Sequence, residues 1–376
     1  MDPADAVLTF LRSVGTHADA EYYLRMFREG PAERFAAIAV DAATMASSGD
    51  AVALDLRFLS QLELTPVVVL GLRDPDAASE DAERLREQLA AAGVGVATHG
   101  DGGDLDIDSI AATARAATIP VVALGEPAAD AREASLSALL DGLQTRKLIF
   151  LRNRGGLRQH GERLSVVNLS DELEGLSKTP DFDDADRRLL AMASRLLSRP
   201  EPGERLIALT SPINLLHELF TLRGAGTLLR RGASITRFDG LSGLDRPRLE
   251  GLLEESFGRA PRAQLFERNL THSYLDAHYR GAALIEATDD WGYLTKFAVT
   301  RRAQGEGLGR DLWQAIAADY PRLVWRARRD NPVTPWYEAN CDGRLRSERW
   351  TAYFRGIDAD DIAGAVRYAL SQPEDF

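Results

Sequence analysis

The chain has 376 residues, of which 45% are hydrophobic, and it carries a formal net charge of −12 at pH 7. This length is enough for two domains of ordinary size, and the hydrophobic fraction is that of a globular protein with a sizeable core. The acidic charge argues against a general nucleic-acid or anionic-membrane surface. A single cysteine, Cys341, excludes internal disulfides and fits a reducing compartment, and the six histidines lack the spacing of metal ligands.

Neither a membrane segment nor a targeting segment is recognisable in the sequence. No apolar run approaches the length of a membrane span. The chain begins with the acidic segment Met1-Asp2-Pro3-Ala4-Asp5, which is unlike a signal or transit peptide. We therefore expect a cytoplasmic protein that binds neither membranes nor nucleic acid.

The first half of the chain alternates between predicted helices and short strands that are almost entirely apolar. Such strands are typical of a mostly parallel sheet with helices on both faces. The predicted helices are residues 4–14, 18–29, 79–92, 107–117 and 130–143, with another that carries apolar residues at helical spacing over 52–62. The predicted strands are residues 35–40, 66–71, 94–97, 119–124, 147–151 and 206–210, with loops at 101–104 and 200–203.

The second half is predicted to follow a linker at residues 230–240. Its helices are expected at residues 246–257, 308–320 and 358–370, the second of them from the four-residue spacing of Leu308, Leu312, Ile316 and Tyr320. Its strands are expected at residues 280–288, 293–300, 323–329 and 346–356, with the first two paired.

A glycine-rich segment, Gln304-Gly305-Glu306-Gly307-Leu308-Gly309, joins one of these strands to the following helix. Glycines allow backbone N–H groups to approach a phosphate, and the helix N-terminus adds a partial positive charge. No Lys-Ser or Lys-Thr follows, as a nucleotide hydrolase would require, and no acidic residue stands where a dinucleotide site needs one. We interpret the segment as an anion cradle, with an ordinary strand–helix turn as the alternative.

Three cations are predicted to converge near this segment. Arg326 and Arg328 are two apart on a predicted strand, so both point to one face, and Lys296 lies on the preceding strand. Arginine binds a carboxylate through two hydrogen bonds. The pattern predicts a substrate with two carboxylates, and a solvated basic edge is the alternative.

Four ordered motifs together resemble the acetyltransferase domain of N-acetylglutamate synthases, in particular the vertebrate-type enzymes and the bacterial synthase/kinase fusions. The resemblance covers residues 240–376 strongly and much of the remaining chain more weakly. The motifs lie at residues 293–299 (Tyr-Leu-Thr-Lys-Phe-Ala-Val), 304–309, 323–328 (Leu-Val-Trp-Arg-Ala-Arg) and 331–337 (Asn-Pro-Val-Thr-Pro-Trp-Tyr). The resemblance implies a GNAT fold, acetyl-CoA as cosubstrate, no metal, and L-glutamate as the acceptor in arginine biosynthesis.

The resemblance also implies roles for individual residues. The hydroxyl of Tyr293 would stabilise or protonate the departing thiolate, since a tyrosine with a pKa near 10 is protonated at neutral pH. The strand before the glycine loop would carry a bulge or splay. Glutamate would be bound by Lys296, Arg326, Arg328, Asn331 and Tyr337, with Arg259 where the family has a lysine. Pantetheine would contact Phe297, Ala298 and Val299, and the pyrophosphate would contact Gln304, Gly305, Gly307, Leu308 and Gly309.

Some motif positions depart from the family, and the general base is not identified. Thr295 replaces the motif aspartate, Thr334 stands where asparagine is common, and Phe354-Arg355 replaces a Phe-Trp pair. These changes could shift the preference among acidic amino acids. Glu286 is a possible base on a predicted strand, with a surface position as the alternative, and deprotonation through water remains open.

The first half resembles N-acetylglutamate kinase, which has the three-layer α/β/α amino acid kinase fold. Residues 147–151, 155–157, 167–169, 218–221 and 224–228 carry this resemblance. The expected organisation is a kinase-like domain at 1–235 and a GNAT domain at 240–376. The kinase chemistry is expected to be absent, because the family's phosphate-binding Lys-x-Gly-Gly falls on Ala39, Asp41 and Ala42. The second glycine loop is reduced to residues 71–74, and later functional positions fall on Ala131 and Leu189.

Alternatives to a monofunctional synthase are a bifunctional synthase/kinase, a non-catalytic arginine sensor and an acetyltransferase for another amine. If the protein is a monofunctional synthase, the kinase-like domain would serve homo-oligomerisation, as a dimer or tetramer, with arginine sensing as a second role. Related proteins bind L-arginine between the N-terminal helix and the late glycine segment. The matching residues here are Tyr22, Tyr23, Glu218, Gly224 and Gly226.

Overall fold

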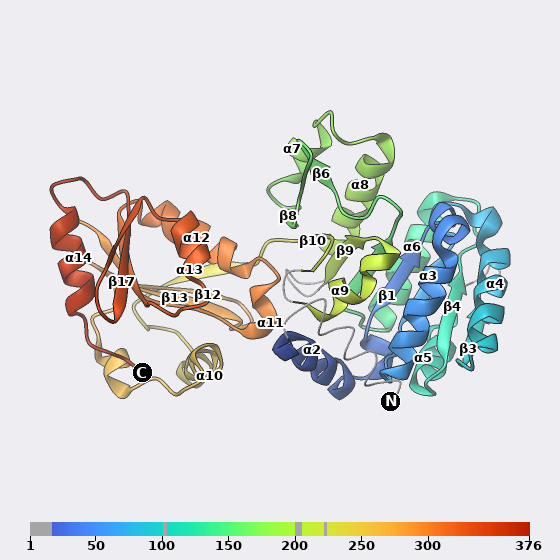
Figure 1. Ribbon diagram of the computed structural model, residues 1–376, viewed down its shortest axis with the longest axis horizontal. Coiled ribbons are helices and arrows are strands. Elements are labelled where there is room, and N and C mark those ends of the chain that lie inside the picture. The colour runs from blue at the N-terminus through green and yellow to red at the C-terminus, as the bar shows by residue number, and fades with distance from the viewer. Residues whose placement is uncertain (1–16, 101–103, 200–204, 222–223) are drawn as a thin grey trace. The chain divides into compact units, whose positions relative to one another are not determined.

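In the computed structural model the chain forms two compact units, residues 1–232 and 233–376 (Figure 1). The structure describes residues 17–100, 104–199, 205–221 and 224–376. The helix predicted for residues 4–14 lies outside the described residues, as do the loop at 200–203 and most of the loop at 101–104.

Eight strands of the described residues form the sheet of the first unit, in the order β3-β4-β2-β1-β5-β9-β10-β8. Neighbouring strands are parallel except for β9 and β10, which are antiparallel. The strands are β1 (Ala37–Val40), β2 (Val67–Leu70), β3 (Val96–His99), β4 (Ile119–Ala123), β5 (Lys147–Leu151), β8 (Val166–Asn168), β9 (Leu206–Thr210) and β10 (Thr227–Arg230). A separate hairpin joins β6 (Arg158–Gln159) and β7 (Glu162–Arg163).

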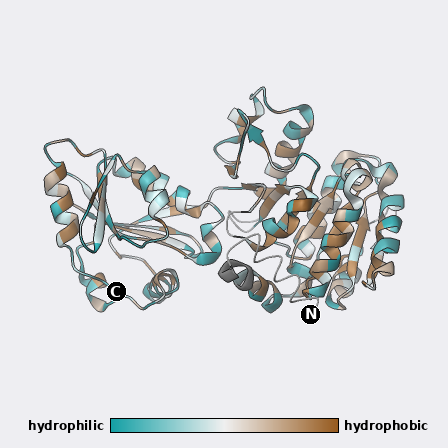
Figure 2. Ribbon diagram, viewed as in Figure 1, coloured by the Kyte–Doolittle hydropathy of each residue, from teal (hydrophilic) through white to brown (hydrophobic). Residues whose placement is uncertain are grey.

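Helices cover both faces of this sheet and make it the middle of three layers. On one face the core includes residues of α2 (His17–Glu29), α3 (Ala42–Gln61), α4 (Ala78–Ala91) and α9 (Leu215–Phe220). On the other it includes residues of α5 (Ile107–Arg115), α6 (Ala129–Gly142), α7 (Leu173–Ser177) and α8 (Asp184–Ser198). The central strands are buried on both faces and are coloured hydrophobic in Figure 2, as expected for a covered parallel sheet. The predicted three-layer α/β/α architecture is confirmed.

Residues 233–376, all of which are described, form a seven-stranded sheet in the order β11-β12-β13-β14-β15-β17-β16. The only parallel pair in it is β14 with β15. The strands are β11 (Ile235–Asp239), β12 (His272–Asp276), β13 (Gly281–Ala287), β14 (Gly292–Val299), β15 (Leu323–Arg328), β16 (Gly343–Arg346) and β17 (Trp350–Arg355).

Two sets of helices pack on opposite faces of the second sheet. Residues of α12 (Leu308–Asp319) and α13 (Thr334–Ala339) pack with Leu294 and Trp325 on one face. On the other face, α10 (Arg246–Phe257) packs with Ala298, and α14 (Ile362–Ser371) packs with Tyr293 and Val324. A short helix, α11 (Arg301–Gln304), precedes α12.

Two expectations about the second half were wrong, and two strands were missed. The predicted linker at 230–240 contains β11, because its residues complete the sheet edge by pairing with β12. The strand β12 itself was not predicted. The strand predicted at 346–356 is confined to β17, which forms a hairpin with β16, a strand that was not predicted; the chain turns between Arg346 and Trp350. Among the described residues, no helix has the length and apolarity needed to cross a membrane.

Candidate active site

A β-bulge in β14 shapes the candidate site. Opposite this strand, Leu284 pairs with Lys296 and Ile285 pairs with Leu294, so that Thr295 is an extra residue without a partner in the ladder. Side chains in a regular strand alternate between faces, and one extra residue reverses the alternation beyond it. The bulge expected before the glycine loop is therefore present.

Beyond the bulge, β14 separates from its parallel neighbour. Pairing of β14 with β15 is limited to Gly292 with Leu323, Tyr293 with Val324, and Leu294 with Trp325. From Thr295 and Arg326 onward the two strands run without pairing each other, while β15 continues to pair with β17 on its other side. The splay leaves backbone groups of β14 available to an extended ligand.

Tyr293 lies on the face covered by α14. Its ring packs edge-to-face against Tyr368 with centroids 5.5 Å apart. Burial raises the pKa of Tyr293 to about 12, while the nearby guanidinium groups of Arg326 and Arg268 oppose this rise. The hydroxyl is therefore protonated over the whole physiological range and lies near the cationic cluster described next.

The three predicted cations do converge on one face of the sheet. Alternation along β15 places Arg326 and Arg328 on the sheet face opposite to that of Trp325. Their guanidinium carbons lie 4.1 and 5.1 Å from the centroid of the Trp350 ring. The ammonium of Lys296 forms an ion pair with Asp375. Burial lowers the pKa of Lys296, Asp375 raises it, and Arg268 and Arg326 lower it further.

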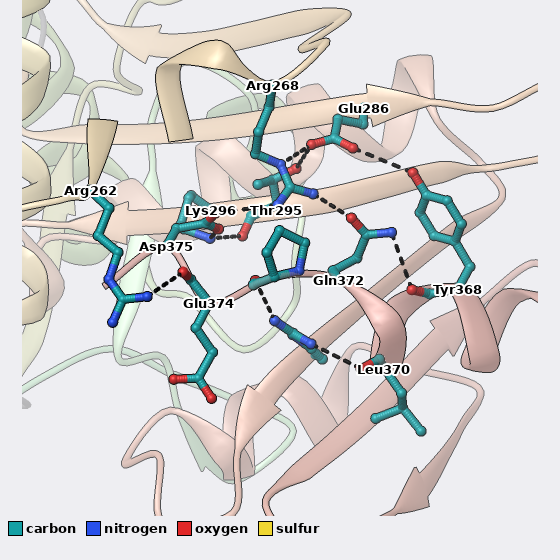
Figure 3. A network of polar contacts seen from close by, with 12 residues as sticks. Arg262, Arg268, Glu286, Thr295, Lys296, Tyr368, Leu370, Gln372, Glu374 and Asp375 are labelled. Carbon is teal, nitrogen blue, oxygen red and sulfur yellow. Dashed lines mark hydrogen bonds and ion pairs between the residues drawn. The ribbon is translucent and has the colours of Figure 1, made fainter. Parts of the chain in front are cut away.

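Each of these cations binds an oxygen of the segment that follows α14, and Figure 3 shows Lys296 beside Asp375. Arg328 Nη2 lies 3.3 Å from Glu374 Oε2. Arg326 donates to the carbonyl oxygens of Leu370 and Pro373, at 3.1 and 2.7 Å. The chain's own carboxylates and carbonyls thus occupy the group that was predicted to bind a substrate carboxylate.

Arg268 is a fourth cation of this cluster, and the sequence motifs did not include it. It follows the short helical turn η4 (Ala263–Glu267), and its side chain is only 8% exposed. It forms ion pairs with Glu286 and with Asp375 Oδ1, the latter at 3.3 Å. Although burial alone would lower the pKa of Arg268, the hydrogen bond to Glu286 raises it.

Glu286, which was considered as a general base, is tied into the same network (Figure 3). Besides Arg268, its carboxylate accepts hydrogen bonds from Thr295 Oγ1 at 3.4 Å and from the Tyr368 hydroxyl at 3.3 Å. It is half-buried rather than a surface group, since its side chain is 13% exposed. Its contacts are those of a residue that positions Arg268.

The glycine segment forms a compact turn at the start of α12. Gly307 is the N-cap of that helix and has φ +80°, a conformation that residues with a β-carbon rarely adopt. The first backbone amides of a helix have no acceptor within it, so those of Leu308 and Gly309 can face an anion. Gln304 donates to the carbonyl oxygen of Val299 at 3.2 Å, which closes the turn onto β14.

An acidic residue inside this turn, Glu306, is neutralised by Arg280, which lies between β12 and β13. Glu306 Oε2 lies 3.4 Å from Arg280 Nη1, and Arg280 binds both oxygens of Asp276 at 2.9 Å. These ion pairs lower the pKa of Asp276 against the effect of burial. Glu306 therefore fixes the turn without leaving an uncompensated negative charge near a phosphate.

The residues predicted to contact pantetheine, together with Asn331, lie in three places. Phe297 and Val299 face α12 and α13, and Phe297 stacks on Trp336 of α13 with ring centroids 5.2 Å apart, whereas Ala298 packs toward α10. Asn331 accepts a hydrogen bond from the amide of Val333 at 2.9 Å, and so shapes the turn after β15.

Tyr337 and Arg259 are not brought into contact with the cluster by any direct bond. Tyr337 packs in the aromatic core against Trp325 and Tyr353, with centroids 5.9 and 5.5 Å away, on the sheet face opposite Arg326. Burial raises its pKa. The guanidinium carbon of Arg259 lies 5.7 Å from the centroid of the Phe376 ring. Lys296 Nζ lies at the same distance, 5.7 Å, from this centroid.

In the first unit, several of the positions aligned to kinase chemistry, among them Ala39, Asp41 and Leu189, line one small cavity at the carboxyl edge of the sheet. It has a volume of about 20 Å³, room for about one water molecule. Asp41 is the N-cap of α3, and its carboxylate accepts a hydrogen bond from the amide of Thr44 at 2.7 Å. The cavity is lined by Ala39, Val40, Asp41, Leu72, Arg73, Phe150, Leu151, Arg152 and Leu189.

The residues considered for arginine binding lie where α2 packs against α9. The buried carboxylate of Glu218 accepts hydrogen bonds from the amides of Ala225 and Gly226, at 2.9 and 3.1 Å, and lies 3.4 Å from Lys147 Nζ. Glu218 therefore holds the late glycine segment in place. Tyr22 and Tyr23 contact each other edge-to-face at 5.4 Å on α2.

A bulged strand that splays from its parallel neighbour, followed by a glycine turn and a helix, defines the second unit as an N-acetyltransferase domain. Residues 235–371 match the family described as "NAT, N-acetyltransferase, of N-acetylglutamate synthase". "Acetylglutamate kinase" of Xylella fastidiosa (strain 9a5c) is 31% identical over 400 residues, which cover 89% of this chain and 93% of that protein. "N-acetylglutamate synthase, mitochondrial" of Homo sapiens is 30% identical over 422 residues, which cover 98% of this chain and 79% of that protein.

Among solved structures, the fold resembles N-acetylglutamate synthase from Neisseria gonorrhoeae, complexed with coenzyme A and L-arginine. The TM-score is 0.55 at 17% identity, covering 90% of this chain and 98% of that one. The same protein complexed with coenzyme A and N-acetyl-glutamate gives a TM-score of 0.53 at 16% identity. The chain belongs to the family that contains the mitochondrial N-acetylglutamate synthases and the related bacterial acetylglutamate kinases.

Proposed function

We propose that the protein is an N-acetylglutamate synthase, which transfers the acetyl group of acetyl-CoA to the α-amine of L-glutamate. The observation that carries the proposal is the cluster of Arg268, Lys296, Arg326 and Arg328 beside the splay of β14 and β15. The cluster binds two carboxylates of the chain itself, those of Glu374 and Asp375. A site that binds two adjacent carboxylates suits an acidic amino acid.

Acetyl-CoA would lie along the splay as the cosubstrate. The backbone of Phe297, Ala298 and Val299 would contact pantetheine, and the turn from Gln304 to Gly309 would hold the pyrophosphate at the start of α12. This placement brings the thioester toward Tyr293, on the strand that also carries Lys296.

The reaction is a direct attack of the amine on the thioester carbonyl. A C–N bond forms, the C–S bond breaks, the amine loses its proton and the thiolate gains one. Cations around the substrate favour the neutral amine, which is the nucleophilic form. Tyr293, whose pKa is raised to about 12 by burial, remains a proton donor for the departing thiolate. Glu286 is bound by Arg268, and we assign it no role as a base.

We propose that kinase activity is absent, although close relatives are named acetylglutamate kinases. Where the kinase family has a phosphate-binding lysine and glycines, this chain has Ala39, Asp41 and Ala42. The cavity beside them holds about one water molecule, and Asp41 would repel a phosphate. ATP-dependent phosphorylation of N-acetylglutamate would contradict this proposal.

The first unit would then act as a scaffold. A homo-oligomer, L-arginine as an effector near Glu218, and a cytoplasmic location remain part of the proposal. Their support is the family resemblance and, for arginine, the fold shared with the Neisseria synthase that is complexed with L-arginine.

The experiment that tests the function is CoA release from acetyl-CoA with glutamate, aspartate and glutamine, in the wild type and in Arg326→Ala. We expect turnover with glutamate above the other two amines and a large loss in Arg326→Ala. Arg367→Ala, which changes an exposed arginine of α14, is the matched control. Absence of turnover with all three amines, in protein that binds acetyl-CoA, would contradict the proposal.

A further inference from the structure

The segment 372–376, Gln-Pro-Glu-Asp-Phe, crosses the cationic cluster, and we call it the acidic strap (Figure 3). The side chain of Asp375 is 3% exposed and forms ion pairs with both Lys296 and Arg268. Gln372 accepts a hydrogen bond from Arg268 Nη2 at 2.6 Å. Asp375 is therefore buried in the cluster, while the other strap residues are partly or fully exposed.

The second carboxylate of the strap is bound by a different pair of cations. Glu374 Oε2 lies 3.3 Å from Arg328 Nη2, and its Oε1 lies 2.6 Å from Arg349 Nη2. Arg262 fixes the strap backbone, with its amide donating to the carbonyl of Asp375 at 2.8 Å and its Nη1 to that of Glu374 at 3.2 Å. Two carboxylates are thus held by two separate sets of cations, as a dicarboxylate ligand would be.

The cluster and the strap differ in their relation to the family. All of these cations lie within residues 235–371, which match the acetyltransferase family, whereas the strap starts at the next residue. The cations therefore lie within the part of the chain that matches the family, and the carboxylates that neutralise them lie just outside it.

We propose that the acidic strap is an intramolecular competitor of the acidic substrate, and that Arg268 is a further specificity-determining residue of the substrate site. This inference rests on the proposed function, since it names the ligand that displaces the strap. Glutamate carries two carboxylates, so it can replace those of Asp375 and Glu374 one for one.

Exchange of the strap carboxylates for those of the substrate explains how the strap can bind tightly and still leave the site. A buried cation left without a counter-charge is strongly destabilising, so Lys296 holds the strap until another carboxylate replaces that of Asp375, whereas Arg268 keeps Glu286 as a partner. A tethered ligand competes at an effective concentration of about millimolar. The strap then raises the apparent KM for glutamate and leaves the rate of the chemical step unchanged.

The first test compares the wild type with Glu374→Gln/Asp375→Asn, which removes both charges and keeps the size of each side chain. A strap that occupies the site in nine molecules of ten raises the apparent KM about tenfold. We expect the double variant to lower the KM for glutamate by about tenfold and to leave kcat and the KM for acetyl-CoA unchanged. Asp360→Asn, a change at an exposed carboxylate, should leave all three values unchanged. An unchanged or raised KM for glutamate in the double variant would overturn the inference.

Arg268 is tested in the same background, where the strap no longer competes. Arg268→Gln should raise the KM for glutamate more than tenfold, with a smaller change for glutamine, and Arg268→Lys should restore part of the affinity. If Arg268 had a purely structural role, its substitution would instead change kcat, or change the KM for glutamate and the KM for glutamine equally. Either result would overturn its assignment.

A second measurement supplies the strap in trans. In a variant that ends at Ser371, the peptide Gln-Pro-Glu-Asp-Phe should inhibit competitively with glutamate, and Gln-Pro-Gln-Asn-Phe should not. Inhibition that is not competitive with glutamate, or equal inhibition by both peptides, would contradict the inference.

Failure of the proposed function can be separated from failure of this inference. If no variant acetylates an acidic amine, the proposed function fails, and calorimetric titration with glutamate then decides about the strap. Tighter binding to Glu374→Gln/Asp375→Asn than to the wild type supports the inference, and equal binding overturns it.

Discussion

Tyr293 and Lys296 lie on the same face of β14, although they are three positions apart in the strand. In a regular strand, residues three apart point to opposite faces. The extra residue Thr295 shifts the alternation by one position, since Ile285 pairs with Leu294 and Leu284 with Lys296, and this brings Lys296 to the face of Tyr293. One bulge thereby joins a protonated hydroxyl and a carboxylate-binding ammonium in one site.

Replacing Tyr293 tests its role as a proton donor. We expect Tyr293→Phe to lower kcat about 100-fold, with a small change in either KM. Because the pKa of Tyr293 is raised to about 12, the hydroxyl stays protonated below that pH. The wild-type to variant ratio of kcat should therefore be constant from pH 7 to 10. A ratio that falls toward one near pH 10 would show that the hydroxyl titrates with an ordinary pKa.

Lys296 makes binding of the substrate carboxylates dependent on pH. Burial lowers its pKa from 10.5, so it loses its charge at a lower pH than an ordinary lysine. The product N-acetylglutamate carries both carboxylates and no amine, so its inhibition constant reports the cations alone. We expect this constant to rise as the pH increases toward 10 in the wild type and to change much less in Lys296→Arg. The same rise in both proteins would assign the titration to another group.

Gly307 tests the anion cradle at the start of α12. Its φ of +80° costs roughly 1–2 kcal/mol for a residue with a β-carbon. We expect Gly307→Ala to raise the KM for acetyl-CoA about fivefold to tenfold and to leave the KM for glutamate nearly unchanged. Gly251→Ala is the control, because a β-carbon on that glycine of α10 meets no atom within 4 Å. Equal effects of the two substitutions would argue against the cradle.

Asp41 offers a test of the first unit that does not depend on activity. As the N-cap of α3 it accepts the hydrogen bond from the Thr44 amide. We expect Asp41→Ala to lower the free energy of unfolding by about 1 kcal/mol, and Asp41→Asn, which keeps an acceptor oxygen, to lower it less. Thermal unfolding followed by circular dichroism measures both. A higher free energy of unfolding in Asp41→Ala than in the wild type would contradict the assignment of Asp41 as a stabilising N-cap.

The sequence motifs were sufficient to predict the convergence of Lys296, Arg326 and Arg328. Local alternation on a strand decides the face on which Arg326 and Arg328 lie, and the motif order decides which strands are neighbours. The three-layer sheet could be predicted for a similar reason, because its strands are continuous apolar runs.

Other parts of the site depend on contacts between distant residues. Arg268 belongs to no motif and reaches the cluster only because the turn η4 packs beside the closing strap. Tyr337 follows the motif in sequence, yet α13 turns its ring into the aromatic core around Trp325. Nothing in an acidic segment at 372–376 indicates that it would neutralise cations on two different strands.

Discrimination between glutamate and glutamine tests the central claim most directly, since the two amines differ only in one carboxylate. The ratio of their kcat/KM values should be measured in the wild type and in Arg326→Ala/Arg328→Ala. The account predicts a preference for glutamate of about 100-fold or more in the wild type, which falls about tenfold or more in the double variant. An unchanged preference in the variant would contradict the assignment of these arginines to the substrate carboxylates.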